Sequence, residues 1–243
     1  MRRGVILSGH GRMGRLIEEQ IVRSDDLELL GVVDTGLFES PNDVPGKVEG
    51  LIDFSYPGNL DGLLRFATER NVPLVLGTTG YDERQLARVR EAAKTVAIVQ
   101  SSNYSAGVAA VKAATRLLKE MLGENFDVEI VEAHHNQKAD APSGTAKMLL
   151  EAVDPANEYA HVFGREGATG ARGKEIGVHA LRGGTVAGTH SVFFFGPDET
   201  VEIRHSAASR QIFVSGALRA LRFVMGKPAG LYAMEDVLRG EKV

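Results

Sequence analysis

A glycine-rich turn near the N-terminus places the strongest restriction on how this chain can fold. The segment Gly9-His10-Gly11-Arg12-Met13-Gly14 follows the apolar run 5–7 and precedes a stretch with helical periodicity. The G-x-G-x-x-G pattern between a strand and a helix is typical of dinucleotide binding, because its glycines let the backbone approach a pyrophosphate at the helix N-terminus. We interpret the segment as a phosphate-binding loop rather than an ordinary tight turn.

The first third of the chain alternates short apolar runs with longer segments of helical period, which is the pattern of a parallel sheet covered by helices. Gly123 stands where a left-handed residue usually ends a helix, so we expect a further helix over 105–122. The predicted strands are residues 5–7, 29–33, 51–54, 72–76 and 96–99.

Beyond residue 123 the pattern changes: an alternating strand comes first, and from residue 176 onward several longer strands follow with little helix between them. Residues 126–131, 185–195 and 200–205 alternate or run apolar, which predicts an antiparallel or mixed sheet. The glycine-rich stretch 154–174 predicts a long loop, and a helix over 215–225 is expected to return to the first domain.

The fold class is therefore α/β. An N-terminal Rossmann-type doubly wound parallel sheet is expected over residues 1–104, completed by 216–243, and an α+β domain with a mixed sheet is expected over 105–215.

Composition narrows the function. The chain contains no cysteine, which excludes disulfides, thiolate metal sites and a cysteine nucleophile. Its net charge of −4 provides no general attraction to nucleic acid or to an anionic membrane. The first apolar run is too short for a signal or membrane-spanning segment, so we expect a cytoplasmic enzyme or binding protein.

Asp34 lies twenty residues beyond Gly14, at the end of the second predicted strand. A carboxylate there accepts hydrogen bonds from the adenosine ribose and repels a 2′-phosphate. Thr35 follows it instead of an arginine, so the sequence leans mildly toward NADH, although Arg12 or Arg15 could pair with the 2′-phosphate of NADPH. The alternative for Asp34 is a solvated strand end.

Two further segments follow predicted strands at the edge where ligands of parallel sheets bind. These are residues 77–80 and 101–104, each with an ordinary turn as its alternative. The complete set of predicted cofactor-binding residues is Ser8, Gly9, His10, Gly11, Arg12, Met13, Asp34, Gly77, Thr78, Thr79, Ser101, Ser102, Asn103 and Tyr104.

The richest polar cluster spans residues 132–147. His134, His135 and Lys138 can carry positive charge or move protons near neutral pH. The stretch 143–145 begins a helix, whose first amides suit a carboxylate, so a small dianion would satisfy both halves. Adjacent histidines on a strand point to opposite faces, and we therefore expect no metal site. The alternative is a helix cap beside surface histidines.

The whole chain resembles the 4-hydroxy-tetrahydrodipicolinate reductase family, also called dihydrodipicolinate reductases. The likeness covers about residues 4–225. It differs at Ser8 and Thr35, where the family usually has a glycine and often a basic residue. It rests on these segments: Gly11-Arg12-Met13-Gly14-Arg15, Ile52-Asp53-Phe54-Ser55, Gly77-Thr78-Thr79-Gly80, the cluster from His134 to Thr145, Arg182-Gly183-Gly184, Gly188-Thr189-His190 and His205-Ser206-Ala207-Ala208-Ser209-Arg210.

The resemblance implies an oxidoreductase that reduces a cyclic imine dicarboxylate with NADH or NADPH in the diaminopimelate route to lysine. It implies a homotetramer assembled through the sheet of the second domain. It also implies that His134 is an acid/base residue and Lys138 the proton donor. In the same reading His135 contacts a substrate carboxylate, and Gly144 and Thr145, next to Ser143, hold a carboxylate.

Two other functions stay open at this point. One is a different Rossmann-type amino-acid dehydrogenase or reductase, which would not need two separate anion pockets. The other is a non-enzymatic dinucleotide-sensing protein, which would keep residues 9–14 and lose the proton donors at His134 and Lys138.

Overall fold

The computed structural model describes residues 2–240, and the chain separates into two compact units. The first unit consists of the chain up to Ala106 together with the chain from Gln211 onward, and the second is Gly107–Arg210. Residues 1 and 241–243 of the predicted dinucleotide-binding domain lie outside the described part. Each unit has its own sheet.

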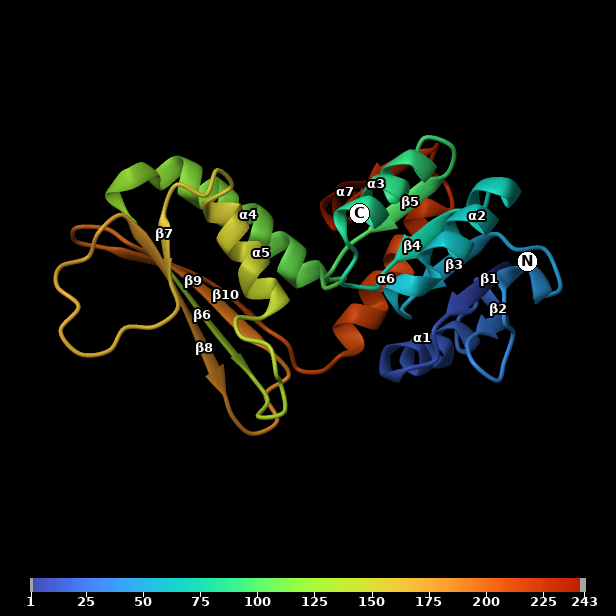
Figure 1. Cartoon of the computed structure of the whole chain (residues 1–243), viewed down its shortest axis with the longest axis horizontal. Helices are drawn as coiled ribbons and strands as arrows, with labels where there is room; N and C mark the ends of the chain where they lie inside the picture. The colour runs from blue at the N-terminus through green and yellow to red at the C-terminus, as the bar shows by residue number, and fades with distance from the viewer. Residues whose placement is uncertain (1, 241–243) are drawn as a thin grey trace. The chain divides into compact units, whose positions relative to one another are not determined.

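The first unit is built on a six-stranded sheet in which every pairing is parallel. Strand β1 lies between β2 and β3, so the order of the strands reverses beside β1 (Figure 1). The predicted doubly wound parallel sheet is confirmed. In the order of the sheet, the strands are β11 (Gly230–Tyr232), β5 (Ala97–Gln100), β4 (Leu74–Leu76), β3 (Gly50–Asp53), β1 (Arg3–Ser8) and β2 (Leu27–Val33).

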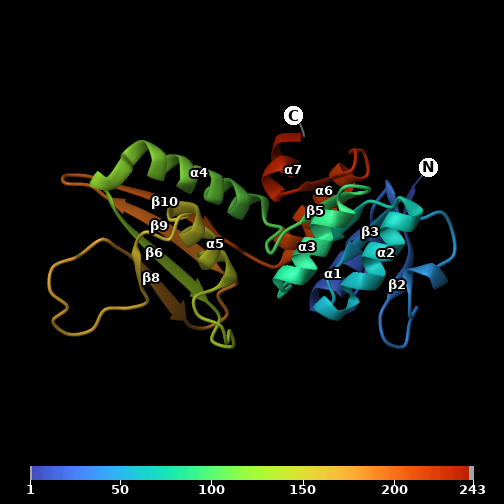
Figure 2. The same cartoon turned by 45° about the horizontal axis from the view of Figure 1, so that its top comes forward.

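Helices cover both faces of this sheet, which explains why its strands are apolar on both sides. On one face Ile6 packs with Leu63 of α2 and Val89 of α3, and on the other α6 contacts β3, β4, β5 and α1 (Figure 2). A capping box between Asp82 and Gln85 begins α3. The helices are α1 (Arg12–Val22), α2 (Leu60–Arg70), α3 (Glu83–Ala92), α6 (Gln211–Val224) and α7 (Met234–Gly240).

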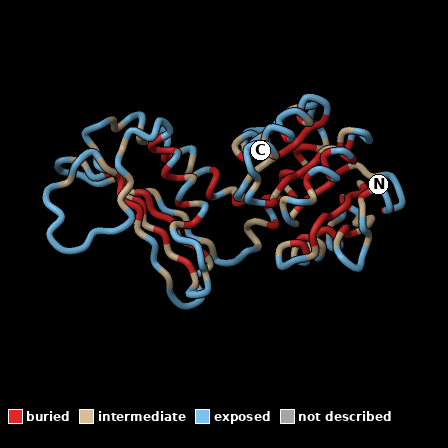
Figure 3. The backbone as a smooth tube through the Cα atoms, viewed as in Figure 1, coloured by how far each residue is buried: buried red, intermediate tan, exposed pale blue. Residues whose placement is uncertain are grey.

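The second unit has a five-stranded mixed sheet, as the sequence predicted. Its strand order is β10-β9-β6-β8-β7, with β6 parallel to β8 and antiparallel to β9. Helices α4 (Ala106–Leu122) and α5 (Gly144–Val153) contribute to one core with this sheet, where Ile130, Leu149 and Phe194 are fully buried. Figure 3 shows the buried stretches along the backbone of each unit. The strands are β6 (Asp127–His134), β7 (Ala160–Val162), β8 (Glu175–Arg182), β9 (Thr189–Phe195) and β10 (Thr200–Ser206).

Some predicted boundaries were wrong. The stretch 154–174 is not entirely loop, because it contains β7, which pairs with β8. Strand β9 begins at Thr189 instead of 185, since Gly184 and Gly188 adopt left-handed φ values of 50° and 149° that a regular strand does not contain. The prediction missed β11 and α7. Among the described residues, no helix is both long enough and apolar enough to cross a membrane.

Candidate functional site

The glycine-rich loop lies at the carboxyl end of β1, beside the point where the strand order reverses. Gly9 has a φ of 94°, and its N–H donates to the carbonyl of Val33 at 3.0 Å. The carboxylate of Asp34 accepts the N–H of His10 and, at 2.7 Å, the N–H of Thr35. The loop and the predicted ribose acid are therefore held against each other.

The surroundings of Gly11 and Gly14 fit a bound pyrophosphate. A Cβ on Gly14 would stand 2.0 Å from the carbonyl oxygen of Gly9, so the helix and the turn touch through backbone alone. Gly11 is the N-cap of α1 and makes no side-chain cap, and nothing lies within 4 Å of where its Cβ would be. The start of α1 thus offers amide groups and open space to an anion.

A cavity of about 470 Å³ adjoins the loop in the first unit. Its lining includes Ser8, Asp34, Glu39, Tyr56 and Asn59. Two of the described lining residues are acidic, and none of them is lysine or arginine. The cavity has the size of a small-molecule site, and its charged lining residues are acidic.

Predicted cofactor residues at the ends of β3 and β4 meet a buried carboxylate. The hydroxyl of Thr78 donates to Asp53 Oδ2 at 2.6 Å and accepts the N–H of Ser55 at 2.8 Å. Asp53 has no exposed surface, and burial raises the pKa of its carboxyl although several hydroxyls bind it. The side chain of Thr78 therefore holds the loop, while Thr79 beside it is exposed.

Side chains of the turn after β5 likewise form hydrogen bonds within the first unit. Tyr104 is almost fully buried, and its hydroxyl donates to the carbonyls of Leu76 and Val99 at 2.8 and 3.2 Å. The hydroxyl of Ser101 donates to the carbonyl of Asn103 at 2.7 Å. Side chains of the 101–104 segment thus shape the turn, and Ser102 is exposed.

In the second unit, alternation along β6 places Val128, Ile130, Glu132 and His134 on the face covered by the helices. Glu132 has no exposed surface and accepts four hydrogen bonds. Both terminal nitrogens of Arg182 donate to it at 2.8 Å, the Nδ1 of His134 lies at 2.6 Å, and the N–H of Ser143 at 2.9 Å. Burial raises the pKa of Glu132, but the bonds from Arg182, His134 and Ser143 outweigh it and lower the pKa.

Ser143 is the N-cap of α5, and its hydroxyl accepts the N–H of Ala146 at 3.1 Å. The same hydroxyl lies 3.1 Å from Nε2 of His190, whose ring meets that of His134 edge-on at 5.1 Å. Burial, and then the charge of His134, lower the pKa of His190 to about 4, so His190 is neutral at pH 7. Gly144 begins the helix facing open space, since no atom lies within 4 Å of its Cβ position.

Lys138 belongs to the turn between β6 and α5. Its ammonium lies 2.8 Å from Oδ1 of Asp140, a pairing that lowers the pKa of that carboxyl. Arg182 donates to the carbonyl of Asp140 at 2.7 Å, so the turn is tied to Glu132 through one guanidinium. His135 is half-buried and follows the last residue of β6. The structure therefore joins His134, Lys138 and Ser143 in one hydrogen-bonded cluster.

Comparison with known proteins decides the family. The model described as "Dihydrodipicolinate reductase, N-terminus" matches residues 3–104, and that described as "Dihydrodipicolinate reductase, C-terminus" matches residues 107–238. The chain belongs to the dihydrodipicolinate reductase family. The family and the enzyme class expected from the sequence, an oxidoreductase, are thus confirmed.

Relatives and a solved structure agree with this membership over nearly the full length. The chain is 42% identical to a 4-hydroxy-tetrahydrodipicolinate reductase of Brachyspira hyodysenteriae, covering 96% of this chain and 99% of that protein. A 4-hydroxy-tetrahydrodipicolinate reductase of Akkermansia muciniphila is 44% identical, covering 94% of this chain and 94% of that protein. A dipicolinate-bound dihydrodipicolinate reductase from Paenisporosarcina sp. TG-14 superposes with a TM-score of 0.77 at 25% identity, covering 96% of this chain and 98% of that one.

Sequence reasoning assigned no role to four residues that the structure places in these clusters: Asp53, Glu132, Arg182 and His190. Glu132 carried a usable signal, because a carboxylate on the buried face of an alternating strand must have partners. Arg182 lies in a segment that resembles the family, but nothing in the sequence pointed to its pairing with Glu132, since fifty residues separate the two and the pairing of β6 with β8 brings them together.

Proposed function

We propose that this member of the family reduces 4-hydroxy-tetrahydrodipicolinate, a cyclic imine dicarboxylate, to tetrahydrodipicolinate with loss of one water molecule, in the diaminopimelate route to lysine. NADH or NADPH supplies the hydride for this reduction. The observation that carries the proposal is the His134–Glu132–Arg182–Ser143 cluster at the start of α5, in a chain whose other unit has a glycine loop suited to a dinucleotide. Such a cluster combines proton transfer with carboxylate binding.

The proposed roles follow from the groups available. His134 acts as an acid/base residue, because its ring is held by Glu132. Lys138 donates the proton as the hydride arrives, and its cation stabilises the negative charge that develops on the substrate. His135, Ser143, Gly144 and Thr145 bind the substrate carboxylates at the N-terminus of α5.

The fold of the second unit supports a homotetramer. Alternation along β8 and β9 places Leu181, Phe193 and Phe195 on the face of the sheet opposite α4 and α5, where Leu181 and Phe195 are exposed. Exposed apolar side chains on a sheet face are suited to burial against another copy of the chain. Assembly through this face and a cytoplasmic location stay predictions.

The central test is an assay of NADH oxidation with the cyclic imine. We expect the enzyme to oxidise NADH in the presence of the imine. We also expect pyridine-2,6-dicarboxylate to protect the protein against heat only when nicotinamide cofactor is present, because the dinucleotide binds before the dicarboxylate. Calorimetry with each ligand alone and with both ligands together measures the thermal stability of the protein in each case. A chain that binds NADH without oxidising it in the presence of the imine would instead be a dinucleotide sensor, and the proposal would fail.

The acidic cavity beside the glycine loop predicts a preference for NADH. Asp34 and Glu39 line the cavity, and a 2′-phosphate placed there would meet negative charge. We expect a higher kcat/KM with NADH than with NADPH at fixed salt, and Thr35→Arg should shift the ratio toward NADPH by about tenfold, since a guanidinium pairs well with phosphate. A wild-type preference of tenfold or more for NADPH would overturn this prediction.

A further inference from the structure

Glu132 is the most thoroughly buried charged group of the second unit's cluster, and the roles above use it only as the partner that holds the ring of His134. Its side chain has no exposed surface, yet hydrogen bonds keep it in the charged form. A buried carboxylate is costly unless each of its oxygens is well paired. Here the pairing is complete, because each oxygen accepts two N–H groups.

The four donors come from three different segments of the chain. Oε2 accepts Nδ1 of His134, the last residue of β6, and Nη1 of Arg182, the last residue of β8. Oε1 accepts Nη2 of Arg182 and the backbone N–H of Ser143, the residue that caps α5. One carboxylate therefore fixes the position of the proposed acid/base residue relative to the proposed carboxylate-binding helix start.

The arrangement also decides which nitrogen of His134 carries the proton. A carboxylate can only accept hydrogen bonds, so Nδ1 of His134 must donate. In the neutral ring Nε2 is then left as the proton acceptor, and a second proton on Nε2 makes it the donor. Gly188 packs against this nitrogen, since its Cβ position would lie 3.0 Å from Nε2.

We propose that Glu132 is a positioning residue that sets the tautomer of His134 and anchors the N-cap of α5, with Arg182 holding the carboxylate in place. The proposal rests on the proposed function, because it assigns His134 and α5 their tasks in that reaction. In this proposal the charge of Glu132 acts on the reaction through His134 and Ser143, and Glu132 itself contacts no substrate.

Glu132→Gln is the informative substitution because glutamine keeps the size and shape of the side chain and replaces one hydrogen-bond-accepting oxygen by an NH₂ group. Glutamine has one carbonyl oxygen, and its NH₂ group must face two of the four donors. Whichever way the amide turns, Arg182 loses an acceptor. In addition, either His134 faces a donor, which favours the opposite tautomer, or the N–H of Ser143 loses its partner.

We expect Glu132→Gln to lower kcat by about 10²-fold, less than the roughly 10⁴-fold loss seen when the carboxylate behind the catalytic histidine of a serine protease is neutralised. KM for NADH should stay within about twofold, because the dinucleotide loop belongs to the other unit. A merely structural role would lower stability without this separation of kcat from KM.

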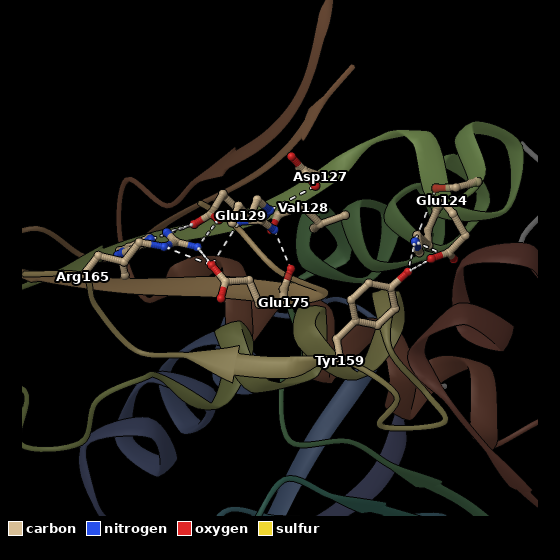
Figure 4. Close-up of polar contacts among 11 residues, drawn as sticks. Glu124, Asp127, Val128, Glu129, Tyr159, Arg165 and Glu175 are labelled. Atoms are coloured by element: carbon tan, nitrogen blue, oxygen red, sulfur yellow. Dashed lines mark hydrogen bonds and ion pairs between the residues drawn. The ribbon is translucent and has the colours of Figure 1, made fainter. Parts of the chain in front are cut away.

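Glu129→Gln is the matched control, and Figure 4 shows the polar contacts around Glu129. Glu129 lies on the same strand, is nearly buried, and is paired with Arg165 at 2.8 Å, with Arg172, and with His179 at 2.8 Å. It points to the opposite face of the sheet, so the two variants remove comparable charges and only one touches the proposed site. Glu129→Gln should retain wild-type kcat, with size-exclusion chromatography checking that assembly is unchanged.

A second measurement uses the wild-type protein, so it does not depend on whether the Glu132→Gln variant folds. Nitrogen-15 NMR of the histidine rings in the wild-type protein at about pH 9, where imidazole is neutral, should show His134 protonated at Nδ1. An Nε2-protonated His134, or a Glu132→Gln enzyme with wild-type kcat, overturns the inference. Absence of imine reduction by the wild type defeats the proposed function instead, and the ring spectrum still decides whether Glu132 sets the tautomer.

Discussion

Lys138→Ala is expected to lower turnover by about 10²-fold or more while leaving NADH affinity nearly intact, as loss of a general acid does. The ammonium of Lys138 is held 2.8 Å from Asp140, in a turn that Arg182 ties to the Glu132 cluster. A proton donor held this firmly pays little entropy to reach its place in the reaction. Steady-state kinetics and a direct measurement of NADH binding test the prediction together.

Lys138→Arg separates proton donation from charge. Arginine keeps the positive charge and can still pair with Asp140, but the very high pKa of its guanidinium makes it a poor proton donor. We therefore expect turnover close to that of the alanine variant, with binding of pyridine-2,6-dicarboxylate largely retained. Lys147→Ala, which removes an exposed lysine from α5, serves as the control with normal turnover. Unchanged turnover in Lys138→Ala would remove this residue from the mechanism.

Elements with a long apolar stripe were predictable because burial imposes a periodicity on them. Ile17 and Ile21 on α1, or Leu63 and Ala67 on α2, recur at helical spacing because one face of each helix meets the sheet. Short elements carry too few residues to show a period. Strand β7 has three residues between polar, glycine-rich segments, and β11 and α7 follow a proline at the end of the chain.

In the candidate site, residues close together in the sequence were predictable, and their partners from distant strands were not. His134, Lys138 and Ser143 lie within ten residues of one another, so a polar cluster was visible in the sequence. The partners that hold them come from distant strands, as with Arg182 of β8 and His190 of β9. Side chains such as Thr78 and Tyr104 were expected to contact a cofactor, and their hydrogen bonds within the fold depend on the packing of strand ends that a linear pattern does not encode.

Gly11 and Gly14, two of the three glycines of the dinucleotide loop, should differ in how alanine at each position affects stability. Gly14→Ala is expected to destabilise the protein by about 1–3 kcal/mol, the usual cost of overpacking. Its Cβ would stand 2.0 Å from the carbonyl oxygen of Gly9, where backbone must move. This outweighs the gain in helix propensity, which is at most about 1 kcal/mol. Thermal unfolding should show a lower Tm, and NADH binding should weaken because the loop shifts.

Gly11→Ala should leave Tm unchanged or slightly higher and still weaken NADH binding by about tenfold, roughly 1.4 kcal/mol. The φ of Gly11 is −72°, which alanine adopts without strain, and no protein atom lies within 4 Å of its Cβ position. Any cost must therefore come from a ligand that needs the same space, as a pyrophosphate resting on the start of α1 does. Wild-type NADH affinity in a stable Gly11→Ala protein would show that the phosphates bind elsewhere.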